Sequence, residues 1–478
     1  MARVVVVGGG PAGLAAAEDL AVRGHAVALV SMGHLLGGKA CSWRDGLGRV
    51  VEHGQHIVGG FYREMGALLA RSGVDMRATS VSGNNELLIW EDRDEACHPL
   101  HFRPATAGTL WEGLRYTGLT LGEKLAFAAV FAQGVPELAA GASERLDDVC
   151  LTAWCLEKGL PASFVLTNAF RCTREAQLNW PGEISAYAML QAVRVMGRDW
   201  KTAEARFPAG GMSEIWWERV AARIEALGGT VVRLKKLVGI EVAGGRVVAL
   251  RFATPLAHPP DAPHQGPVPS GPEERWTDFD AVVIAVPPPC LQEVLPPEVA
   301  ALPGLTGISR LTTVAPLAMQ VWHRASVTRG PRTVVCGLPE PLGFVVDNKP
   351  NYPHLRDDAS IGASLHFVGQ EALYEDWEDE ALLDRALTGV RRLPGWEGFD
   401  RAGVLDFTVV RSRGPHHRYW NAEPGSLAFK PHARTPVAGL WLAGDWIRTP
   451  LDFPCIENAV RSGRQAAALL DSHPGGVS

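Results

Sequence analysis

A glycine-rich run near the start of the chain has the residue types and spacing that bind a dinucleotide. The run is Gly8-Gly9-Gly10-Pro11-Ala12-Gly13. In this pattern the first glycine permits a tight turn, Gly10 lets the backbone approach a pyrophosphate, and Gly13 lets a helix pack closely on a strand. Pro11 and Ala12 suit the first turn of that helix, whose positive end would face the phosphates.

The elements that must position this loop can be predicted from the residues around it. Val4 to Val7 is a β-branched run typical of a strand that is buried on both faces. An apolar helical pattern follows and stops at Gly24, and Ala26 to Val30 indicates a second strand. The first 31 residues therefore predict a complete strand–helix–strand unit of the kind that holds a dinucleotide.

The residue after the second predicted strand departs from the usual pattern. An acidic side chain normally stands there and binds the ribose hydroxyls, whereas this chain has Ser31. A serine hydroxyl can make a hydrogen bond to the ribose, but it lacks the charge-assisted strength of a carboxylate. We expect Ser31 to lie at the cofactor with a weaker hold on the ribose.

Further motifs lie toward both ends of the chain: Leu36-Gly37-Gly38-Lys39, Glu52-His53-Gly54-Gln55-His56, Gly60-Phe61-Tyr62, Gly439 to Trp446 and Ile456 to Gly463. Together they resemble the flavin amine oxidase superfamily. Within it, they look most like the plant-type carotenoid desaturases and the bacterial squalene-associated desaturases, such as hydroxysqualene dehydroxylase. The resemblance covers the flavin-binding segments, about half of the chain.

The resemblance implies FAD as the cofactor and assigns roles to individual residues. Gly37, Gly38 and Lys39 would form a second glycine-rich loop beside the flavin, and Lys39 stands where many members have arginine. Gly54 and His56 would lie near the cofactor. His56 is our catalytic candidate, as a group that shapes the site or moves a proton, and its position is equally consistent with a core histidine.

The remaining implied cofactor contacts come from the second half of the chain. Val238 would contact the adenine through its backbone, and Ala285 and Pro287 would close a strand against the cofactor. Gly444 and Asp445 would lie at the pyrophosphate and ribityl side. Ile456 and Glu457 would open the last helix, whose N-terminus would point at the isoalloxazine ring, and Asn458 replaces the glycine usual there.

The two ends of the chain therefore meet at one cofactor, so the lobes are predicted to be interleaved. We expect an α/β fold with a Rossmann-like FAD-binding domain, formed by 1–84, 205–287 and 426–478, and an α+β substrate domain, formed by 85–204 and 288–425. The proline-rich stretch from Pro255 to Pro272 is predicted to extend a surface hairpin.

The function that the resemblance implies is oxidation of an apolar substrate. A flavin can accept hydride at N5, which no side chain can do. Leu110 to Leu138 is strongly apolar, and in the desaturases a comparable region frames a hydrophobic tunnel and can touch a membrane; it can also be ordinary core. We expect an FAD-dependent desaturase or dehydrogenase of a hydrophobic isoprenoid-like molecule, with an unknown electron acceptor.

Two alternatives remain open. Amine oxidases of this superfamily carry a lysine near flavin N5 on a strand of the substrate lobe, and an alignment of Val314 to Arg324 on that strand places Leu317 there. This argues against an amine oxidase of that type. The other alternative is a flavin-free binder of apolar or prenyl ligands, which the replacement at Ser31 favours.

Composition excludes several other classes. A net charge of -6 without a basic tract gives no reason to expect nucleic acid as a partner. The eight cysteines lack paired spacing, which predicts reduced thiols and no metal site. The first apolar run is too short for a signal peptide or a membrane span, so we expect a cytoplasmic protein with peripheral membrane contact at most.

Overall fold

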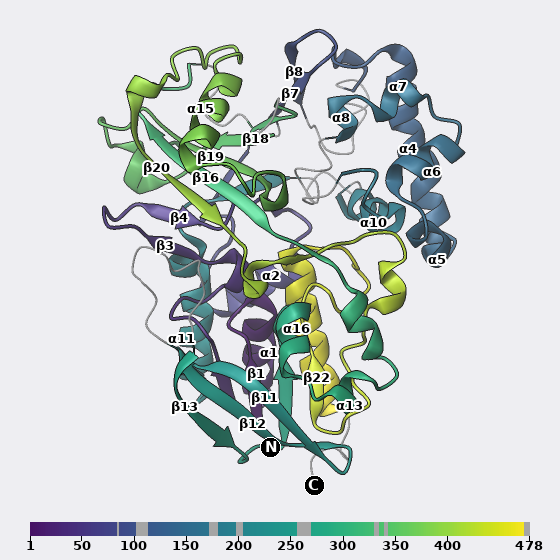
Figure 1. Ribbon diagram of the computed structural model, residues 1–478, viewed down its shortest axis with the longest axis vertical. Helices are drawn as coiled ribbons and strands as arrows, with labels where there is room; N and C mark the ends of the chain where they lie inside the picture. Colours follow the sequence, from purple (N-terminus) through teal and green to yellow (C-terminus); the bar gives the residue numbers. More distant parts are fainter. Residues whose placement is uncertain are drawn as a thin grey trace.

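The computed structural model describes residues 1–83, 86–101, 113–171, 180–196, 204–255, 269–328, 334–338 and 343–472. Two lobes lie one above the other in Figure 1, and the N-terminus lies at the bottom of the lower lobe. The lower lobe is built on a five-stranded sheet and the upper lobe on a seven-stranded sheet.

The lower lobe contains a parallel sheet in the order β10-β2-β1-β14-β22. Its strands are β1 (Arg3–Val7), β2 (Ala26–Val30), β10 (Thr230–Val232), β14 (Ala281–Ile284) and β22 (Leu440–Leu442). The valines of β1 are buried, because β1 is the central strand and helices cover the sheet. The α/β class and the Rossmann-like arrangement are therefore confirmed.

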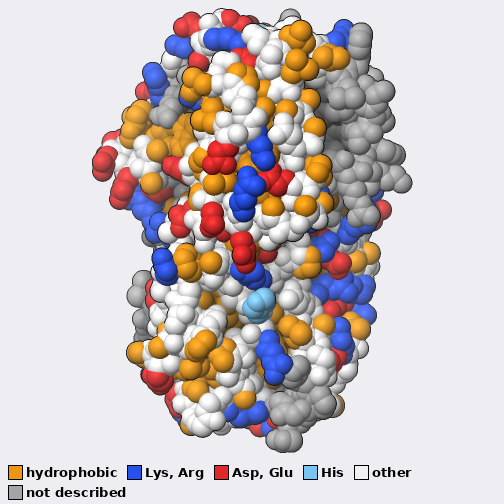
Figure 2. All heavy atoms as spheres, turned by 90° about the vertical axis from the view of Figure 1, so that its right-hand side faces the viewer, with side chains coloured by type: hydrophobic (Ala, Val, Ile, Leu, Met, Phe, Trp, Pro, Cys, Tyr) orange, Lys and Arg blue, Asp and Glu red, His pale blue; other side chains and the backbone are white. Residues whose placement is uncertain are grey.

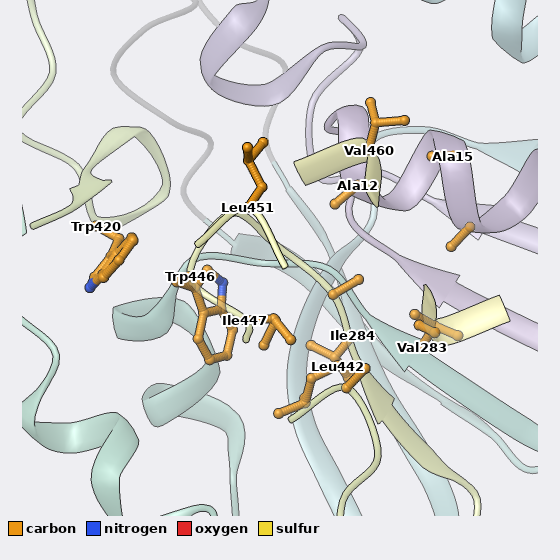
Figure 3. Close-up of a cluster of buried hydrophobic side chains, with 14 of the residues drawn as sticks. Ala12, Ala15, Val283, Ile284, Trp420, Leu442, Trp446, Ile447, Leu451 and Val460 are labelled. Carbon is orange, nitrogen blue, oxygen red and sulfur yellow. The ribbon is translucent and has the colours of Figure 1, made fainter. Parts of the chain in front are cut away.

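Helices α1 (Pro11–Val22), α2 (Arg63–Arg71), α11 (Glu218–Ala226) and α16 (Ile456–Asp471) pack around this sheet. Helix α1 is buried from Pro11 to Ala21, since it lies between the sheet and the other helices. It touches α16 so closely that a Cβ atom on Gly463 would lie 2.1 Å from the carbonyl oxygen of Ala12. Figure 3 shows Ala12 and Ala15 beside Val460 at this contact.

The upper lobe contains a mixed sheet in the order β20-β16-β19-β18-β17-β7-β8. Its strands are β7 (Glu86–Glu91), β8 (Ala96–His101), β16 (Pro316–His323), β17 (Val334–Cys336), β18 (Phe344–Asp347), β19 (Ala363–Gln370) and β20 (Val404–Arg411). Helix α15 (Asp379–Val390) packs against one face, where Leu382, Leu383, Ala386 and Leu387 join a core with the sheet.

A group of helices completes the upper lobe on the right of Figure 1. It contains α4 (Leu121–Ala139), α5 (Ser143–Asp147), α6 (Leu151–Glu157), α7 (Ala162–Val165), α8 (Asn168–Arg171) and α10 (Ala186–Met196). Thr120 and Glu123 form a reciprocal capping box that fixes the start of α4. The apolar region predicted between Leu110 and Leu138 is thus helical from Leu121, and its first residues, up to 112, lie outside the described part.

The remaining strands and helices lie outside the two main sheets. They are β3 (Ser42–Arg44), β4 (Val50–Glu52), β5 (Val58–Gly59), β6 (Ser80–Ser82), β9 (Ala205–Pro208), β11 (Lys236–Ala243), β12 (Arg246–Pro255), β13 (Pro269–Trp276), β15 (Thr313–Val314), β21 (Tyr419–Trp420), α12 (Pro288–Val294), α13 (Pro297–Ala300) and α14 (Pro353–Arg356). Strands β12 and β13 pair antiparallel, as expected for a hairpin, and 256–268 lies outside the described residues.

The chain passes between the lobes several times. The strands of the parallel sheet come from within 1–84, 205–287 and 426–478, whereas those of the seven-stranded sheet come from within 85–204 and 288–425. This distribution agrees with interleaved lobes, and the domain boundaries themselves stay a prediction.

Candidate functional site

The first glycine loop follows β1 and opens α1. Gly8 has φ +122°, and a Cβ atom there would lie 2.3 Å from the carbonyl oxygen of Ala285. A Cβ atom on Gly13 would lie 1.9 Å from the carbonyl oxygen of Gly8. The protein's own packing therefore requires both glycines.

Gly10 differs from these two neighbours. Within the described part of the chain, a Cβ atom on Gly10 would have only one contact, with the Cα of Gly38 at 3.9 Å. Gly10 is also the N-cap of α1, and no described side chain caps this helix. The N–H groups of the first turn thus lie beside open space, which is the arrangement that receives a pyrophosphate.

The second glycine loop lies directly against the first. Gly37 and Gly38 have φ +114° and +54°. The N–H of Gly37 donates to the carbonyl oxygen of Gly9 at 2.8 Å, and a Cβ on Gly38 would lie 3.1 Å from the Cα of Gly10. The two predicted loops therefore form one continuous backbone surface.

A π-helical turn over Ser213–Trp217 supports the second loop. The Ser213 hydroxyl donates to the carbonyl oxygen of Leu36 at 2.6 Å, and the Trp217 indole donates to that of Ala40 at 2.9 Å. The Trp217 ring fills the space beside Gly37, because a Cβ atom on this glycine would lie 2.4 Å from the ring's Cδ1. Trp217 belongs to none of the motifs named from the sequence, so this supporting role is a finding of the structure.

Lys39 and Asp445 come from opposite ends of the chain and form an ion pair. The Lys39 Nζ lies 3.1 Å and 3.2 Å from the two carboxylate oxygens of Asp445. The same ammonium group lies 4.8 Å from the ring centre of Tyr419. The structure thus brings together two residues that were predicted separately as cofactor contacts.

Asn458 stands where the family usually has glycine, and two hydrogen bonds hold its side chain in place. Its amide nitrogen donates to the carbonyl oxygen of Asp445 at 2.7 Å, and its amide oxygen accepts from the Thr449 hydroxyl. The N–H of Gly444 donates to Ser462 Oγ at 2.8 Å. The turn that carries Asp445 is therefore fastened to α16 by side chains.

Ile456 and Glu457 open α16 as predicted, but the Glu457 side chain turns away from the glycine loops. Its two carboxylate oxygens accept hydrogen bonds from the N–H groups of Glu64 and Met65, each at 3.0 Å. Burial raises the pKa of Glu457, and these two donors oppose that rise. Glu457 therefore caps α2, and any cofactor contact it makes comes from its backbone.

The next four predicted cofactor contacts are Ser31, Val238, Ala285 and Pro287. Ser31 is buried, and a Cβ on Gly9 would lie 2.6 Å from its hydroxyl oxygen. Val238 lies at a break in register between β11 and β12, so its backbone is outside that ladder. The N–H of Ala285 donates to the carbonyl oxygen of Val7 at 2.7 Å, and Pro287 is the N-cap of α12.

The segment with Gly54 and His56 lies where the two lobes meet. The Nδ1 atom of His56 is buried and has no hydrogen-bond partner among the described residues. Burial lowers the pKa of His56 to about 4, with a partly opposing contribution from the Gly54 backbone. His56 is therefore neutral at pH 7. The Gln55 side chain is bound by the Asn348 amide of the upper lobe, which fixes the segment.

A buried polar group next to this segment joins the lobes. The Tyr352 hydroxyl donates to one carboxylate oxygen of Glu52 at 3.1 Å, while the other oxygen, Oε1, is buried without a partner in the described part of the chain. Burial raises the pKa of Glu52 to about 8. The Glu52 N–H donates to Gln320 Oε1 at 3.3 Å, and Gln320 also lies 2.8 Å from His366 Nε2.

The alignment that placed Leu317 at the amine oxidase lysine position is corrected by the strand's geometry. Leu317 packs with Met319 and Val321 in the core beneath α15, away from the lower lobe. Because side chains alternate along a strand, Ala318 and Gln320 face the lower lobe instead. The residue that faces the site was therefore misassigned by one position.

A segment that the sequence did not single out passes over the two glycine loops. Residues 415–417 contact the second glycine loop, and Tyr419 lies under Lys39. Three buried polar atoms in this segment have no hydrogen-bond partner within the described ranges: Arg418 Nε, Trp420 Nε1 and Asn421 Oδ1. Unsatisfied buried groups are rare in proteins, so the segment is suited to face a ligand. No glycine pattern marks it.

These observations fit a flavin dinucleotide. The open backbone at Gly10 and the uncapped α1 suit its pyrophosphate. The start of α16 has Cys455 as N-cap, whose Sγ accepts from the N–H of Asn458 at 3.3 Å and leaves the earlier N–H groups of this turn to a ligand. The orphaned atoms near Lys39 and His56 add hydrogen-bonding capacity for a polar ring.

Comparisons with known proteins identify the class. The family model described as flavin containing amine oxidoreductase matches residues 11–470. The chain belongs to this family, and it is a flavin-dependent oxidoreductase.

Individual relatives show which members of the family the chain resembles. The chain is 26% identical to a 15-cis-phytoene desaturase from an Oncidium hybrid cultivar, covering 98% of this chain and 77% of the relative. It is 24% identical to the 15-cis-phytoene desaturase of Synechococcus elongatus, covering 98% and 95%. A structure of putrescine oxidase bound to putrescine has a TM-score of 0.72 at 16% identity, covering 98% and 99%. The predicted likeness to desaturases is thus confirmed.

Three further findings concern expectations from composition. The seven cysteines within the described residues are all free thiols. None of the described helices is long and apolar enough to cross a membrane. No group of three or more His, Cys, Asp or Glu side chains in the described ranges could hold a metal ion.

Proposed function

We propose that the chain is an FAD-dependent desaturase or dehydrogenase that acts on a hydrophobic, isoprenoid-like substrate. The observation that carries this proposal is the match to phytoene desaturases along 98% of the chain. The putrescine oxidase likeness, at 16% identity, supports the shared fold alone. Sequence therefore favours a desaturase, and fold does not distinguish it from an amine oxidase.

The strand that faces the lower lobe supports the same choice. Strand β16 reads Pro-Leu-Ala-Met-Gln-Val-Trp-His and contains no lysine. The groups on its site-facing side are Ala318 and Gln320. An amine oxidase with a lysine on this strand is therefore disfavoured, although by a different residue from the one that the sequence indicated.

The residues of the chain would bind and orient the reactants. Bound FAD would supply the hydride acceptor, at its N5 atom. Gly10 and the uncapped α1 would hold the pyrophosphate, Lys39 and Asp445 would lie beside it, and Val238 would meet the adenine. His56, neutral because its pKa is about 4, would serve as a hydrogen-bonding group rather than as an acid.

An apolar surface near the helical group suits a substrate that dissolves in lipid. Leu114, Leu121 and Leu125 are 52%, 65% and 62% exposed. They lie together, because Leu121 and Leu125 are one helical turn apart and Lys124 of the same helix donates to the carbonyl oxygen of Leu114. Figure 2 shows apolar side chains over the upper half of this side of the molecule. We assign this patch to peripheral contact with a lipid surface.

The proposed function is tested by adding FAD to the purified protein, desalting it and recording the visible spectrum. Retained flavin absorbance near ~450 nm in about one equivalent is expected. The loaded protein is then mixed without oxygen with phytoene in liposomes or with putrescine. Bleaching by phytoene alone supports the proposal, whereas bleaching by putrescine favours the amine oxidase. A protein that does not bind FAD would instead be a binder of apolar ligands.

A further inference from the structure

Helix α10 carries two buried polar side chains, one helical turn apart. Tyr187 and Gln191 are 8% and 4% exposed. The Gln191 amide nitrogen donates to the Tyr187 hydroxyl oxygen at 2.8 Å, which fixes the direction of the amide. The Gln191 amide oxygen, Oε1, is buried and has no hydrogen-bond partner among the residues that the structure describes. A buried acceptor left in this state destabilises the protein unless a ligand binds it.

The Tyr187 hydroxyl complements that acceptor. Its oxygen accepts a hydrogen bond from the Gln191 amide nitrogen, so its own O–H remains able to donate, and no hydrogen bond from it to another described residue is found. Burial, followed by the Asp452 carboxylate, raises the pKa of Tyr187, so the phenol keeps its proton. The pair thus offers one acceptor and one donor side by side, which are the two partners that an alcohol needs.

The pair lies at the junction between the helical group and the candidate flavin site. Ser185, just before α10, donates through its N–H to the carbonyl oxygen of Ala422 at 2.8 Å. Tyr187 is close enough to Asp452 for an electrostatic effect, and Asp452 lies three residues before Cys455, the N-cap of α16. In Figure 1, α10 lies on the side of the helical group that faces α16.

A buried ion pair makes this junction polar as well. Lys430 and Asp452 are 4% and 6% exposed, and Lys430 Nζ lies 2.5 Å from Asp452 Oδ1. Asp452 has φ +52°, an uncommon conformation for a residue other than glycine. The junction beside Tyr187 therefore contains a buried charge pair and a residue in an uncommon backbone conformation.

We propose that Tyr187 and Gln191 bind a hydroxyl group of the substrate, which is then an oxygen-bearing apolar molecule rather than a pure hydrocarbon. The alcohol donates to Gln191 Oε1 and accepts from the Tyr187 O–H. This inference rests on the proposed function, since it names the class of substrate for the same site. Two contacts of this kind set the position of a long apolar chain relative to α16.

The test compares two probes that differ in one group: geranylgeraniol, and the hydrocarbon with hydrogen in place of its hydroxyl. Equilibrium dialysis measures the Kd of each probe for the full chain, with and without FAD. The wild type is expected to bind the alcohol about 10-fold more tightly, as one to two net hydrogen bonds provide. Tyr187→Phe and Gln191→Leu each bring the ratio close to one and leave the hydrocarbon Kd unchanged.

The control is Met189→Leu, a buried substitution of similar volume on the same helix, which keeps the preference for the alcohol. Equal affinities of the wild type for the two probes would overturn the inference, as would variants that weaken both probes equally. If phytoene bleaches the flavin of the loaded protein but the alcohol is not preferred, only this inference is overturned. If the alcohol is preferred but the protein does not bind FAD, only the proposed function is overturned.

Discussion

The two faces that meet at the candidate site are built from different materials. The lower face consists of backbone, because Gly8, Gly10 and Gly38 have no side chain. A Cβ atom on Gly8 would clash with neighbouring backbone, whereas Gly10 lies beside open space. The opposite face carries buried polar side chains, such as Glu52 at the junction of the lobes and Gln191 of the helical group, each with an oxygen that no described residue binds. On the proposed assignment, the difference means that the cofactor would be recognised through shape and backbone N–H groups, and the substrate through specific side chains.

Among the substitutions in the lower face, Gly10→Val is expected to reduce FAD affinity most. A side chain fits the protein at this position, since its Cβ would meet only one described atom, at 3.9 Å, but it fills the space proposed for the pyrophosphate. We expect FAD affinity to fall by ~1000-fold or more, which is about 4 kcal/mol, with little change in thermal stability. Fluorescence titration with FAD and thermal melting measure the two effects.

Two glycines provide the comparison for that substitution. Gly46→Val, where a Cβ meets nothing within 4 Å in the described structure, should leave both FAD binding and stability unchanged. Gly13→Val should destabilise the fold itself, because its Cβ would lie 1.9 Å from a carbonyl oxygen. Full FAD binding by Gly10→Val would show that the pyrophosphate lies elsewhere.

The stability of the junction between the helical group and the candidate flavin site depends on the Lys430–Asp452 ion pair, which Lys430→Met tests. This variant leaves the Asp452 carboxylate buried without its partner, and breaking a buried pair costs about 3–5 kcal/mol. Chemical denaturation should report a loss of this size. The double variant Lys430→Met with Asp452→Asn should recover part of it, and if the double variant is as unstable as the single one, the pair is not what stabilises the junction.

A smaller effect is expected at Glu52 and depends on pH. Burial raises the pKa of Glu52 from 4.5 to about 8, so the contribution of this carboxyl to stability is fully present below pH 4.5 and is lost as the pH rises through 8. Glu52→Gln removes the titration and should raise Tm by about 2–5 °C at pH 8 relative to the wild type, with less change at pH 5.

The control for Glu52 is Glu214→Gln, which removes a half-exposed carboxyl paired with Arg44. It should leave the difference in Tm between pH 5 and pH 8 as it is in the wild type. A Glu52→Gln variant whose Tm falls with pH as steeply as that of the wild type would mean that Glu52 is ionised in the folded protein.

The apolar patch should matter for lipid and not for cofactor. Leu121→Asp with Leu125→Asp places two charges on the exposed start of α4, and we expect liposome binding in a flotation assay to fall by about 10-fold. FAD binding should not change. Leu47→Asp, at a 74% exposed leucine elsewhere on the surface, is the control; equal losses from both changes would remove the patch as the contact.

The smallest effect is expected at Ser31. Ser31→Glu restores the carboxylate that usually holds the ribose hydroxyls, and a gain of about 3- to 10-fold in FAD affinity would follow from one charge-assisted hydrogen bond. Ser31→Ala serves as its partner measurement. If neither substitution changes the Kd, another group already holds the ribose.

The glycine loops could be predicted because their requirement is local. Positive φ at Gly8 and Gly37 and the helix start at Pro11 depend on residue type and near neighbours, which the sequence states directly. The turn of Glu457 toward α2 could not be predicted in this way. Its partners are about 390 positions earlier in the chain, and no periodic pattern records which buried carboxylate caps which helix.

Two other residues show why the upper lobe was harder to predict. Leu317 was placed one position from the residue that faces the site, since an apolar strand buried on both faces reads the same in either register. Gln191 lies in an apolar helix and carries no motif. Its importance comes from an acceptor that no described residue binds, which only the assembled structure reveals.

The order of strands in the lower sheet has a consequence for how the protein is made. Strand β1 precedes β22, Asp445 and α16 by more than 400 residues in the chain, and these later elements complete the sheet and the candidate site. Some 400 residues are therefore synthesised between β2 and β22, so the five-stranded sheet cannot be complete before that length of chain has been made. A chain that ends before β22 would lack Asp445 and the start of α16, and we expect such a chain not to bind FAD.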